Sequence, residues 1–201
     1  MGISQEQIKL LRDKTGAGVL SCKNALVETE GNFEKALAFL RQKGLASAEK
    51  KLSRSTKQGI ITSYIHTGSK IGVLLELNCE TDFVARRIEF QNLAKNLAMQ
   101  VASGNGLNYV SLKDIPNALW ESETLLENQR EDVKMKPETI RESIVRGRVE
   151  KTLKTLTLLN QACIRDLDLS VEEYIKNHVS LLGENIQVAR FSKFVLGELE
   201  E

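Results

Sequence analysis

In the first 44 residues, apolar side chains recur at the spacing of an α-helix, and glycines separate the apolar segments. The third segment shows this spacing most clearly, with apolar residues at i, i+3, i+4 and i+7: Phe33, Ala36, Leu37 and Leu40. Ser4 and Gln7 form a capping-box pattern ahead of the first segment, and Asn32 suits the cap of the third. The pattern predicts a compact bundle of three helices, each ending near a glycine: Gly16, Gly31 and Gly44.

After the bundle, the helical spacing gives way to alternation of apolar and polar residues. The sequence GIITSYIHTGSKIGVLLELNC indicates two antiparallel strands joined by a turn at HTGSK. Every second residue of the second strand is apolar: Ile71, Val73, Leu75, Leu77 and Cys79. One face of this hairpin is therefore expected to be buried.

Helical spacing returns after the hairpin. The next helix is expected to end near Gly104 and carries four spaced apolar residues: Phe90, Leu93, Leu97 and Val101. A more polar helical region follows around Trp120, and its charged tail, ENQREDVKMK, is expected to be exposed. Pro137 suits the start of another helix, in which Gly147 is expected to mark a close helix contact. That helix has an apolar line (Val145, Val149, Leu153 and Leu156) and a face expected to be hydrated: Arg141, Arg148, Lys151 and Lys154.

The C-terminal part predicts one more helix and a strand. Ser170 and Glu173 form a capping box, and Gly183 suits the end of that helix. The apolar alternation of NIQVARFSKFVLGE shifts once, which indicates a bulge in a strand that joins the early hairpin. The order of elements predicts an α+β fold: a helical bundle with a basic linker at residues 1–54, and a core domain at 55–201 in which helices pack on a small antiparallel sheet. The linker is helical or extended, and an RNA contact there stays an alternative.

Composition narrows the function classes. The chain has 201 residues, of which 28 are basic and 27 acidic, and the net charge of +1 argues against a general binder of nucleic acid. No apolar run approaches the length of a membrane span, and the N-terminus lacks a signal-peptide core. The three cysteines are far apart and odd in number, which indicates a reducing compartment. Together with the two histidines, they form no local zinc motif. We therefore expect no membrane, no metal and no direct nucleic-acid partner.

Catalytic motifs are missing from the sequence. It contains no GxxxxGKS, GxGxxG or GxSxG pattern, so we expect neither covalent catalysis nor a cofactor. Cys79 and His66 flank the hairpin, which leaves a thiol enzyme as a hypothesis. Cys79 falls on the apolar face, however, where a cysteine usually acts as a small buried hydrophobe.

The segment TDFV, residues Thr81–Val84, stands where the second strand gives way to a helix. Thr81 and Asp82 both have side chains that cap helices, so either residue is a candidate for the cap. Local chemistry leaves two interpretations of Phe83. It either belongs to the core beside an ordinary cap or is held out towards a partner.

Several longer segments resemble the elongation factor Ts family: LRDKTGAGVLSCKNAL, AFLRQKGLASAEKK, SYIHTGSKIGVLLELNCETDFVARR, IRESIVRGRVEK and LGENIQVARFSKFVLGE. The resemblance covers effectively the whole chain. It implies an N-terminal bundle of the ubiquitin-associated type. It also implies a guanine-nucleotide exchange factor that binds elongation factor Tu in its GDP-bound and nucleotide-free states and promotes GDP release.

The resemblance also implies roles for particular residues. The exchange motif would be Thr81, Asp82, Phe83 and Val84, whose aspartate and phenylalanine enter the partner's GTPase domain near its magnesium and phosphate site. The N-terminal grip on that domain would be Arg12, Val19 and Leu20, although the family often has methionines at the last two positions. His66 matches a histidine that leans towards another domain of the partner. Ser21 and Asn24 depart from the family's usual form of this segment.

The chain is short for this family and resembles members with one core copy. This implies a homodimer through the sheet, which would also cover an open sheet edge. The resemblance is to forms from cyanobacteria and plastids, and so implies the bacterial cytoplasm or the plastid stroma. A ubiquitin-type or nascent-chain adaptor that uses the N-terminal bundle alone stays the alternative function.

Overall fold

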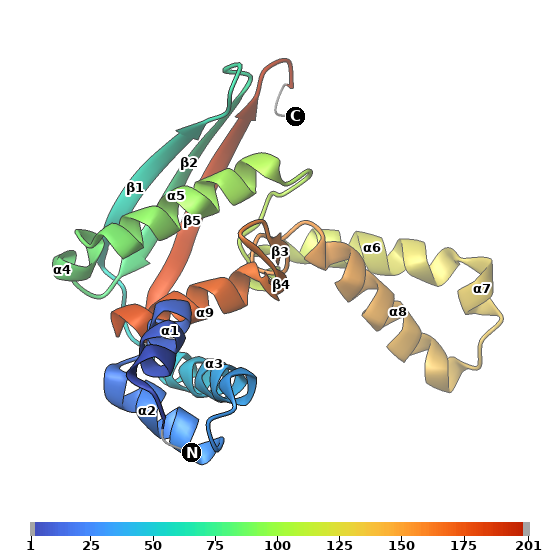
Figure 1. Ribbon diagram of the computed structural model, residues 1–201. Helices are drawn as coiled ribbons and strands as arrows, with labels where there is room; N and C mark the ends of the chain where they lie inside the picture. Colours follow the sequence, from blue (N-terminus) through green and yellow to red (C-terminus); the bar gives the residue numbers. More distant parts are fainter. Residues whose placement is uncertain (1–2, 199–201) are drawn as a thin grey trace. The chain divides into compact units, whose positions relative to one another are not determined.

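The computed structural model describes residues 3–198, which form the α+β fold that the sequence predicts (Figure 1). The N-terminal helices are α1 (Gln5–Thr15), α2 (Val19–Glu28) and α3 (Phe33–Glu49). They are followed by β1 (Gln58–Ile65), β2 (Ile71–Cys79), α4 (Asp82–Ala85) and α5 (Ile88–Ser103). The remaining elements are the 3-10 turn η1 (Leu112–Asp114), α6 (Asn117–Gln129), α7 (Glu131–Lys134), α8 (Glu138–Lys154), β3 (Ala162–Cys163), β4 (Asp166–Ser170), α9 (Val171–Leu182) and β5 (Ile186–Val195).

The chain divides into two compact units, each built from separate stretches of sequence. The first unit contains the residues up to Thr62, Glu76–Lys95 and Glu173–Val188. The second unit contains Ser63–Leu75, Asn96–Glu172 and the residues from Ala189 on. Neither unit is one continuous stretch, and the domains expected from the sequence, 1–54 and 55–201, stay a prediction.

Helices α1 to α3 form the predicted bundle in the first unit, around six buried side chains: Leu11, Cys22, Ala25, Leu26, Ala36 and Leu40. The capping box of α1 is present, because Ser4 Oγ accepts from the Gln7 N–H and Gln7 Oε1 accepts from the Ser4 N–H, both at 3.1 Å. Gly16 ends this helix in the left-handed region, with φ 66°. The first two predicted helices are confirmed in position.

The third helix is longer than predicted, because α3 continues past Gly44 to Glu49. A glycine inside a helix costs about 1 kcal/mol relative to alanine. The helix-forming residues that follow, and the burial of Ala48, offset this cost. A Cβ on Gly44 would lie 3.2 Å from Ser180 Oγ, so the glycine allows α3 to approach α9 closely within the first unit. The linker therefore begins as helix.

The main sheet has three strands in the order β1–β2–β5, so the C-terminal strand joins the early hairpin as predicted. Strand β2 buries four of the residues on its apolar face: Val73, Leu75, Leu77 and Cys79. Leu74 points to the opposite face and is 49% exposed. In β5 the alternation of burial shifts after Val188, where Ala189 and Arg190 are both exposed. Helix α5 also buries the stripe that its spacing predicts: Phe90, Leu93, Leu97 and Val101.

Helices α6, α7 and α8 form a hairpin in the second unit (Figure 1), with a core of Ile115, Val133, Val145, Val149 and Leu153. Two expectations are wrong here. The charged tail of α6 is not wholly exposed, because α7 turns Val133 into this core. Gly147 marks no helix contact, because a Cβ added there would meet open space among the described residues.

The hydrated face expected on α8 is also wrong in part. Arg148 donates to Asp132 Oδ2 at 2.6 Å and to Glu127 Oε2 at 3.5 Å, so it ties α8 to α6 and α7. Arg141 donates to the carbonyls of Lys134 and Lys136 at 2.9 and 3.2 Å. These two arginines close the hairpin at its charged turn.

A second, two-stranded sheet was not predicted. Strands β3 and β4 pair antiparallel in the second unit, with Ala162 opposite Ser170 and Cys163 opposite Asp166. The buried Gln100 of α5 holds this sheet, because its side chain donates to Ala162 O at 3.1 Å and accepts from the Ile164 N–H at 2.8 Å. Strand β3 has two residues and β4 has five, which is too short for a pattern of alternation to predict the pair.

Helix α9 begins at Val171 and ends at Leu182, next to Gly183, as predicted. Val171 and Val179 are fully buried. Within residues 3–198, no helix is both long enough and apolar enough to span a bilayer.

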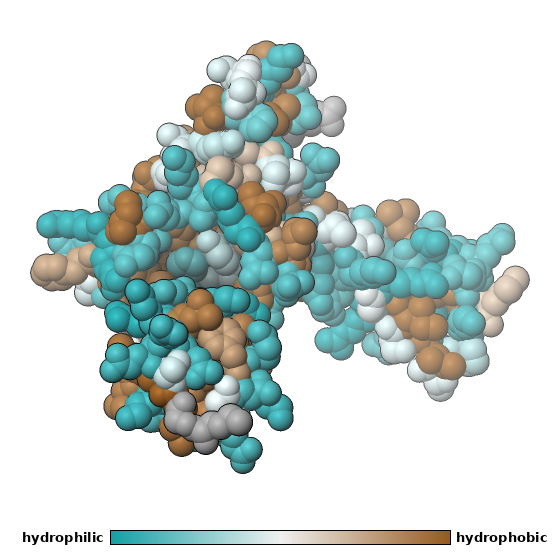
Figure 2. All heavy atoms as spheres, in the orientation of Figure 1, coloured by the Kyte–Doolittle hydropathy of each residue, from teal (hydrophilic) through white to brown (hydrophobic). Residues whose placement is uncertain are grey.

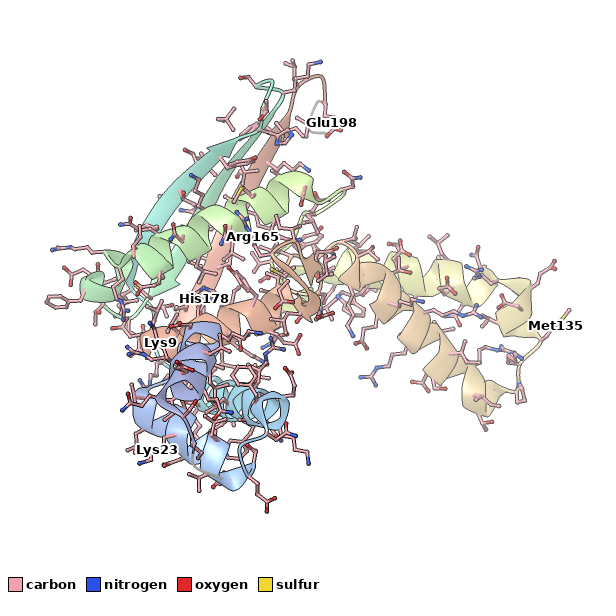
Figure 3. All side chains as sticks on the ribbon, viewed as in Figure 1. Lys9, Lys23, Met135, Arg165, His178 and Glu198 are labelled. Atoms are coloured by element: carbon pink, nitrogen blue, oxygen red, sulfur yellow. The ribbon has the colours of Figure 1, made fainter. Side chains whose placement is uncertain are left out.

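His178 lies on α9 (Figure 3), partly buried, with its ring edge-on to Tyr174 at 4.6 Å between centroids. Burial lowers the pKa of His178 below its ordinary 6.5, more than its hydrogen bond to the Tyr174 carbonyl raises it. The folded state therefore favours the neutral ring over the protonated one. The stability that comes from a neutral His178 is fully present above pH 6.5 and is lost as the pH falls towards the lowered pKa.

We expect His178→Gln to flatten the pH dependence of stability. Between about pH 7.5 and about pH 5.5, the unmodified chain should lose more thermal stability than the variant, because only the unmodified chain has to charge a buried imidazole. Melting curves at stepped pH measure this difference. His66→Gln, at an exposed position on the hairpin turn, is the matched control. Parallel pH profiles for the unmodified chain and His178→Gln would contradict the assignment.

Candidate functional site

The 81–84 turn, Thr81–Val84, joins β2 to α5 through the short helix α4. Thr81 is extended, with φ −128° and ψ 156°, and its Oγ1 accepts from the Val84 N–H at 3.4 Å. Thr81 is therefore the cap. The alternative that Asp82 caps the helix is wrong, because Asp82 is the first helical residue. The cap fixes where the strand ends and the direction in which the helix leaves it.

Phe83 is 77% exposed, whereas its neighbour Val84 is 7% exposed. Successive residues of a helix point about 100° apart, so one turn of helix can bury the valine and present the phenylalanine to solvent. The interpretation of Phe83 as a core residue is wrong. A phenylalanine ring buries a large apolar area when it finds a partner, so Phe83 stays a candidate for a protein contact.

Asp82 forms an ion pair with Arg86, four residues on, at 2.8 Å between Oδ2 and Nη2. The two side chains are 47% and 78% exposed. A pair this exposed contributes well under about 1 kcal/mol, because water screens both charges. The carboxylate beside Phe83 is therefore held in place yet accessible to another cation.

Glu184, on the loop between α9 and β5, holds the start of the turn. Its Oε1 accepts from Thr81 Oγ1 at 2.6 Å, and its Oε2 accepts from the Thr81 N–H at 2.9 Å and from the Glu80 N–H at 3.1 Å. Hydrogen bonds to a carboxylate are about twice as strong as those between neutral groups. The turn is therefore fixed by a residue about one hundred positions away in the sequence.

A second set of hydrogen bonds surrounds the first. Glu80 Oε1 accepts from the Asn185 N–H at 2.6 Å, and Arg54 lies 3.5 Å from the same oxygen. The fully buried Asn185 donates from Nδ2 to the carbonyls of Leu52 and Arg54, at 3.2 and 2.7 Å. These bonds join the segment that follows α3 to the loop that holds the turn.

Cys79 is buried directly before the turn, and its Sγ donates to the Thr81 carbonyl at 3.1 Å. Burial, reinforced by the nearby Glu184 carboxylate, raises the pKa of Cys79 to about 11. A nucleophilic cysteine needs a lowered pKa. The thiol-enzyme hypothesis is therefore wrong for Cys79, and the interpretation as a small buried residue is confirmed.

Known proteins that are similar to this chain come from one family. A family model described as elongation factor Ts matches residues 30–198. The chain is 54% identical to the chloroplastic elongation factor Ts of Rhodomonas salina, over 98% of this chain and 90% of that relative. Identity is also 54% to elongation factor Ts of Synechococcus elongatus, over 98% and 89%, and to the chloroplastic protein of Phaeodactylum tricornutum, over 98% of each chain.

This chain belongs to the elongation factor Ts family. It is therefore a nucleotide exchange factor for elongation factor Tu in translation elongation, as the resemblance implies. The expected similarity to cyanobacterial and plastid forms is confirmed by the relatives.

The residues expected to form the N-terminal grip of this elongation factor Ts lie at the surface of the bundle. Arg12 is exposed near the end of α1, and Val19 and Leu20 are 54% and 70% exposed at the start of α2. The left-handed Gly16 between them turns the chain from one helix into the next. Val19 and Leu20 are neighbours in the sequence, and two exposed aliphatic residues of this kind suit a protein contact.

His66 is exposed on the hairpin turn, in the second unit, with its Nδ1 3.2 Å from the Tyr64 hydroxyl. The backbone N–H of His66 donates to the carbonyl of Ile71 at 2.9 Å. Ile71 is the first residue of β2 and Cys79 is the last. The hypothetical pair of His66 and Cys79 is therefore separated by the length of a strand.

The second unit has a hollow on its helical hairpin, away from His66 in the sequence. A hollow of about 500 Å³ between α6 and α8 is lined by nine residues: Trp120, Thr124, Asn128, Glu138, Arg141, Glu142, Val145, Arg146 and Val149. Figure 2 shows apolar side chains at the surface of the same hairpin. The exposed apolar residues of this hairpin include Leu125, Leu126 and Met135. Within residues 3–198, no three His, Cys, Asp or Glu side chains are grouped as they would be to hold a metal ion.

Proposed function

We propose that this elongation factor Ts expels GDP with the side chains of Asp82 and Phe83, which the 81–84 turn presents to the magnesium and phosphate site of elongation factor Tu. The observation that carries the proposal is the 77% exposure of Phe83 on a turn whose start is anchored on all sides. An aromatic ring that projects from its own core on a turn anchored in this way is suited to enter another protein.

Nucleotide release of this kind requires no covalent step. A factor that binds the empty GTPase more tightly than the loaded one weakens nucleotide binding by the same factor, because the two equilibria are linked. The factor must therefore bind both the GDP-bound and the nucleotide-free partner, with a preference for the second. No cofactor is needed for this, and the chain needs no catalytic residue.

Phe83 is suited to act as a wedge because a phenyl ring is large, apolar and stiff, and a packed protein interior has no room for it without rearrangement. Asp82 adds a negative charge close to a site whose charge balance depends on Mg²⁺ and phosphate. Arg86 holds this charge only by an exposed ion pair, so the partner can compete for it. Thr81 and Val84 anchor the turn beneath the two.

The grip would come from Arg12, Val19 and Leu20 of the bundle, with a weaker contribution from His66. These contacts would supply affinity in both nucleotide states, and the turn would supply the preference. Since the relatives are cyanobacterial and chloroplastic proteins, we place the activity in the bacterial cytoplasm or the plastid stroma.

A titration of GDP release tests this division of roles. Elongation factor Tu loaded with fluorescent GDP is mixed with increasing concentrations of the factor, and the release rate is fitted to a maximum and a half-saturating concentration. We expect Asp82→Ala and Phe83→Ala to lower the maximum, and the double variant Val19→Ser/Leu20→Ser to raise the half-saturating concentration. A fall in the maximum for the double variant alone, with Asp82→Ala unchanged, would reverse the assignment.

We further propose a homodimer through the open face of the sheet. Strands β1 and β5 are both edge strands, and three apolar side chains of the second unit are exposed on them and on β2: Ile65, Leu74 and Phe194. Exposed apolar residues on a sheet are commonly covered by a partner. Sedimentation should show a dimer for the unmodified chain and a monomer for Leu74→Lys. A monomer in both cases would refute the homodimer.

A further inference from the structure

Three polar groups of one residue, Thr81, are all engaged. Its N–H and its hydroxyl donate to Glu184, at 2.9 and 2.6 Å, and its carbonyl accepts from Cys79 Sγ at 3.1 Å. The N–H belongs to the peptide group before Thr81 and the carbonyl to the peptide group after it, so neither group can rotate without breaking a hydrogen bond. The backbone that leads into α4 therefore has one orientation.

The carboxylate of Glu184 also sets the direction of the cap. An ionised carboxylate only accepts hydrogen bonds, so the proton of Thr81 Oγ1 must point towards Glu184. The lone pairs of Oγ1 are then free to accept from the Val84 N–H at 3.4 Å. The chain of bonds runs from Val84 through Thr81 to Glu184, and a glutamine at 184 would place an amide group among these donors.

The direction of Phe83 depends on this backbone. At 77% exposure, the ring has little packing of its own, so the turn restricts it only by setting the direction of its Cα–Cβ bond and the rotamers open to it. Because Glu184 fixes the start of that turn, it acts on Phe83 through the backbone.

The same loop reaches the segment that follows the bundle. Asn185 donates to the carbonyls of Leu52 and Arg54, and its N–H donates to Glu80. Glu184 and Asn185 are neighbours in the sequence. Glu184 holds the 81–84 turn, and Asn185 holds the end of the linker. All of these residues belong to the first unit.

We infer that Glu184 is a positioning residue for nucleotide exchange, which aims Phe83 by holding the Thr81 backbone and hydroxyl. The inference rests on the proposed function of the 81–84 turn. Glu184 would not touch elongation factor Tu itself. It would change how effectively the bound factor expels GDP, and not how tightly the bundle grips.

The test is the GDP-release titration with Glu184→Gln in the full chain. We expect the maximum rate to fall at least about tenfold, the size expected when charge-assisted hydrogen bonds are lost, and the half-saturating concentration to change by less than about threefold. Thr81→Val should act like Glu184→Gln, whereas Thr81→Ser keeps the hydroxyl and should restore most of the rate. Glu121→Gln, at an exposed carboxylate of α6, is the matched control.

A second measurement separates positioning from a general loss of structure. In a Phe83→Ala background, Glu184→Gln should lower the maximum rate little further, because the group that it aims is gone. An equal further loss in that background, or a rise in the half-saturating concentration alone, would overturn the positioning role. If Phe83→Ala is active and Glu184→Gln is not, the proposed function fails. If Phe83→Ala is impaired and Glu184→Gln is not, only the role of Glu184 fails.

Discussion

Phe83→Ala should retain the fold of the chain and lose most of its stimulation of GDP release. We expect the maximum rate to fall about 10- to 100-fold, which corresponds to a loss of about 1.4–2.7 kcal/mol of transition-state stabilisation. The ring is 77% exposed, so its removal should change the free energy of unfolding by no more than about 0.5 kcal/mol. Stopped-flow release of fluorescent GDP and a thermal melt measure the two quantities on one sample.

Two controls make this result specific. Leu167→Ala removes an apolar side chain of similar exposure, 78%, from β4, and should leave both quantities unchanged. Phe83→Leu keeps an apolar group but loses the stiff ring, and should fall between the unmodified chain and Phe83→Ala. An unchanged rate for Phe83→Ala, with a normal melt, would show that the ring is not the wedge.

Phe90→Ala should have the opposite profile. Phe90 is fully buried at the start of α5, seven residues from Phe83 in the sequence. Its truncation should lower the free energy of unfolding by about 3–5 kcal/mol, because the lost apolar contact leaves a cavity in the core. For a chain of this length, such a loss lowers the melting temperature on the order of 10 °C.

The comparison of the two phenylalanines is itself the test of the burial pattern. Phe90→Leu fills most of the volume and should recover most of the stability. Below its lowered melting temperature, Phe90→Ala should still release GDP at close to the normal maximum rate. A mild effect of Phe90→Ala on unfolding would mean that α5 is not anchored in the core through this residue.

Periodic segments of the sequence predicted most of the fold. The spacing of Phe90, Leu93 and Leu97 and the alternation from Val73 to Cys79 follow from burial on one face, and both are confirmed. The predicted end of α3 failed because a glycine inside a helix is tolerated where it permits a close approach, here to Ser180. Gly147, by contrast, faces open space, so the sequence alone cannot distinguish these two uses of glycine.

The 81–84 turn could be located from the sequence, but the hydrogen bonds that support it could not. The sequence TDFV after a strand predicted a helix cap at Thr81 or Asp82. It also gave an exposed Phe83 as one of two interpretations. Glu184 and Asn185 follow a glycine that ends a helix, where polar residues are ordinary. Their role depends on contacts with residues more than one hundred positions away, which no local pattern records. The burial of Asn185 is visible only in the folded chain.

The affinity of the factor for elongation factor Tu in its two nucleotide states tests the central claim most directly. Binding to the nucleotide-free and the GDP-bound partner is measured by titration calorimetry, for the unmodified chain and for Phe83→Ala. We predict that the unmodified chain strongly prefers the empty partner, and that Phe83→Ala reduces this preference mainly by binding the GDP-bound partner more tightly than before. An undiminished preference in Phe83→Ala would contradict the account, because nucleotide would then be expelled without the ring.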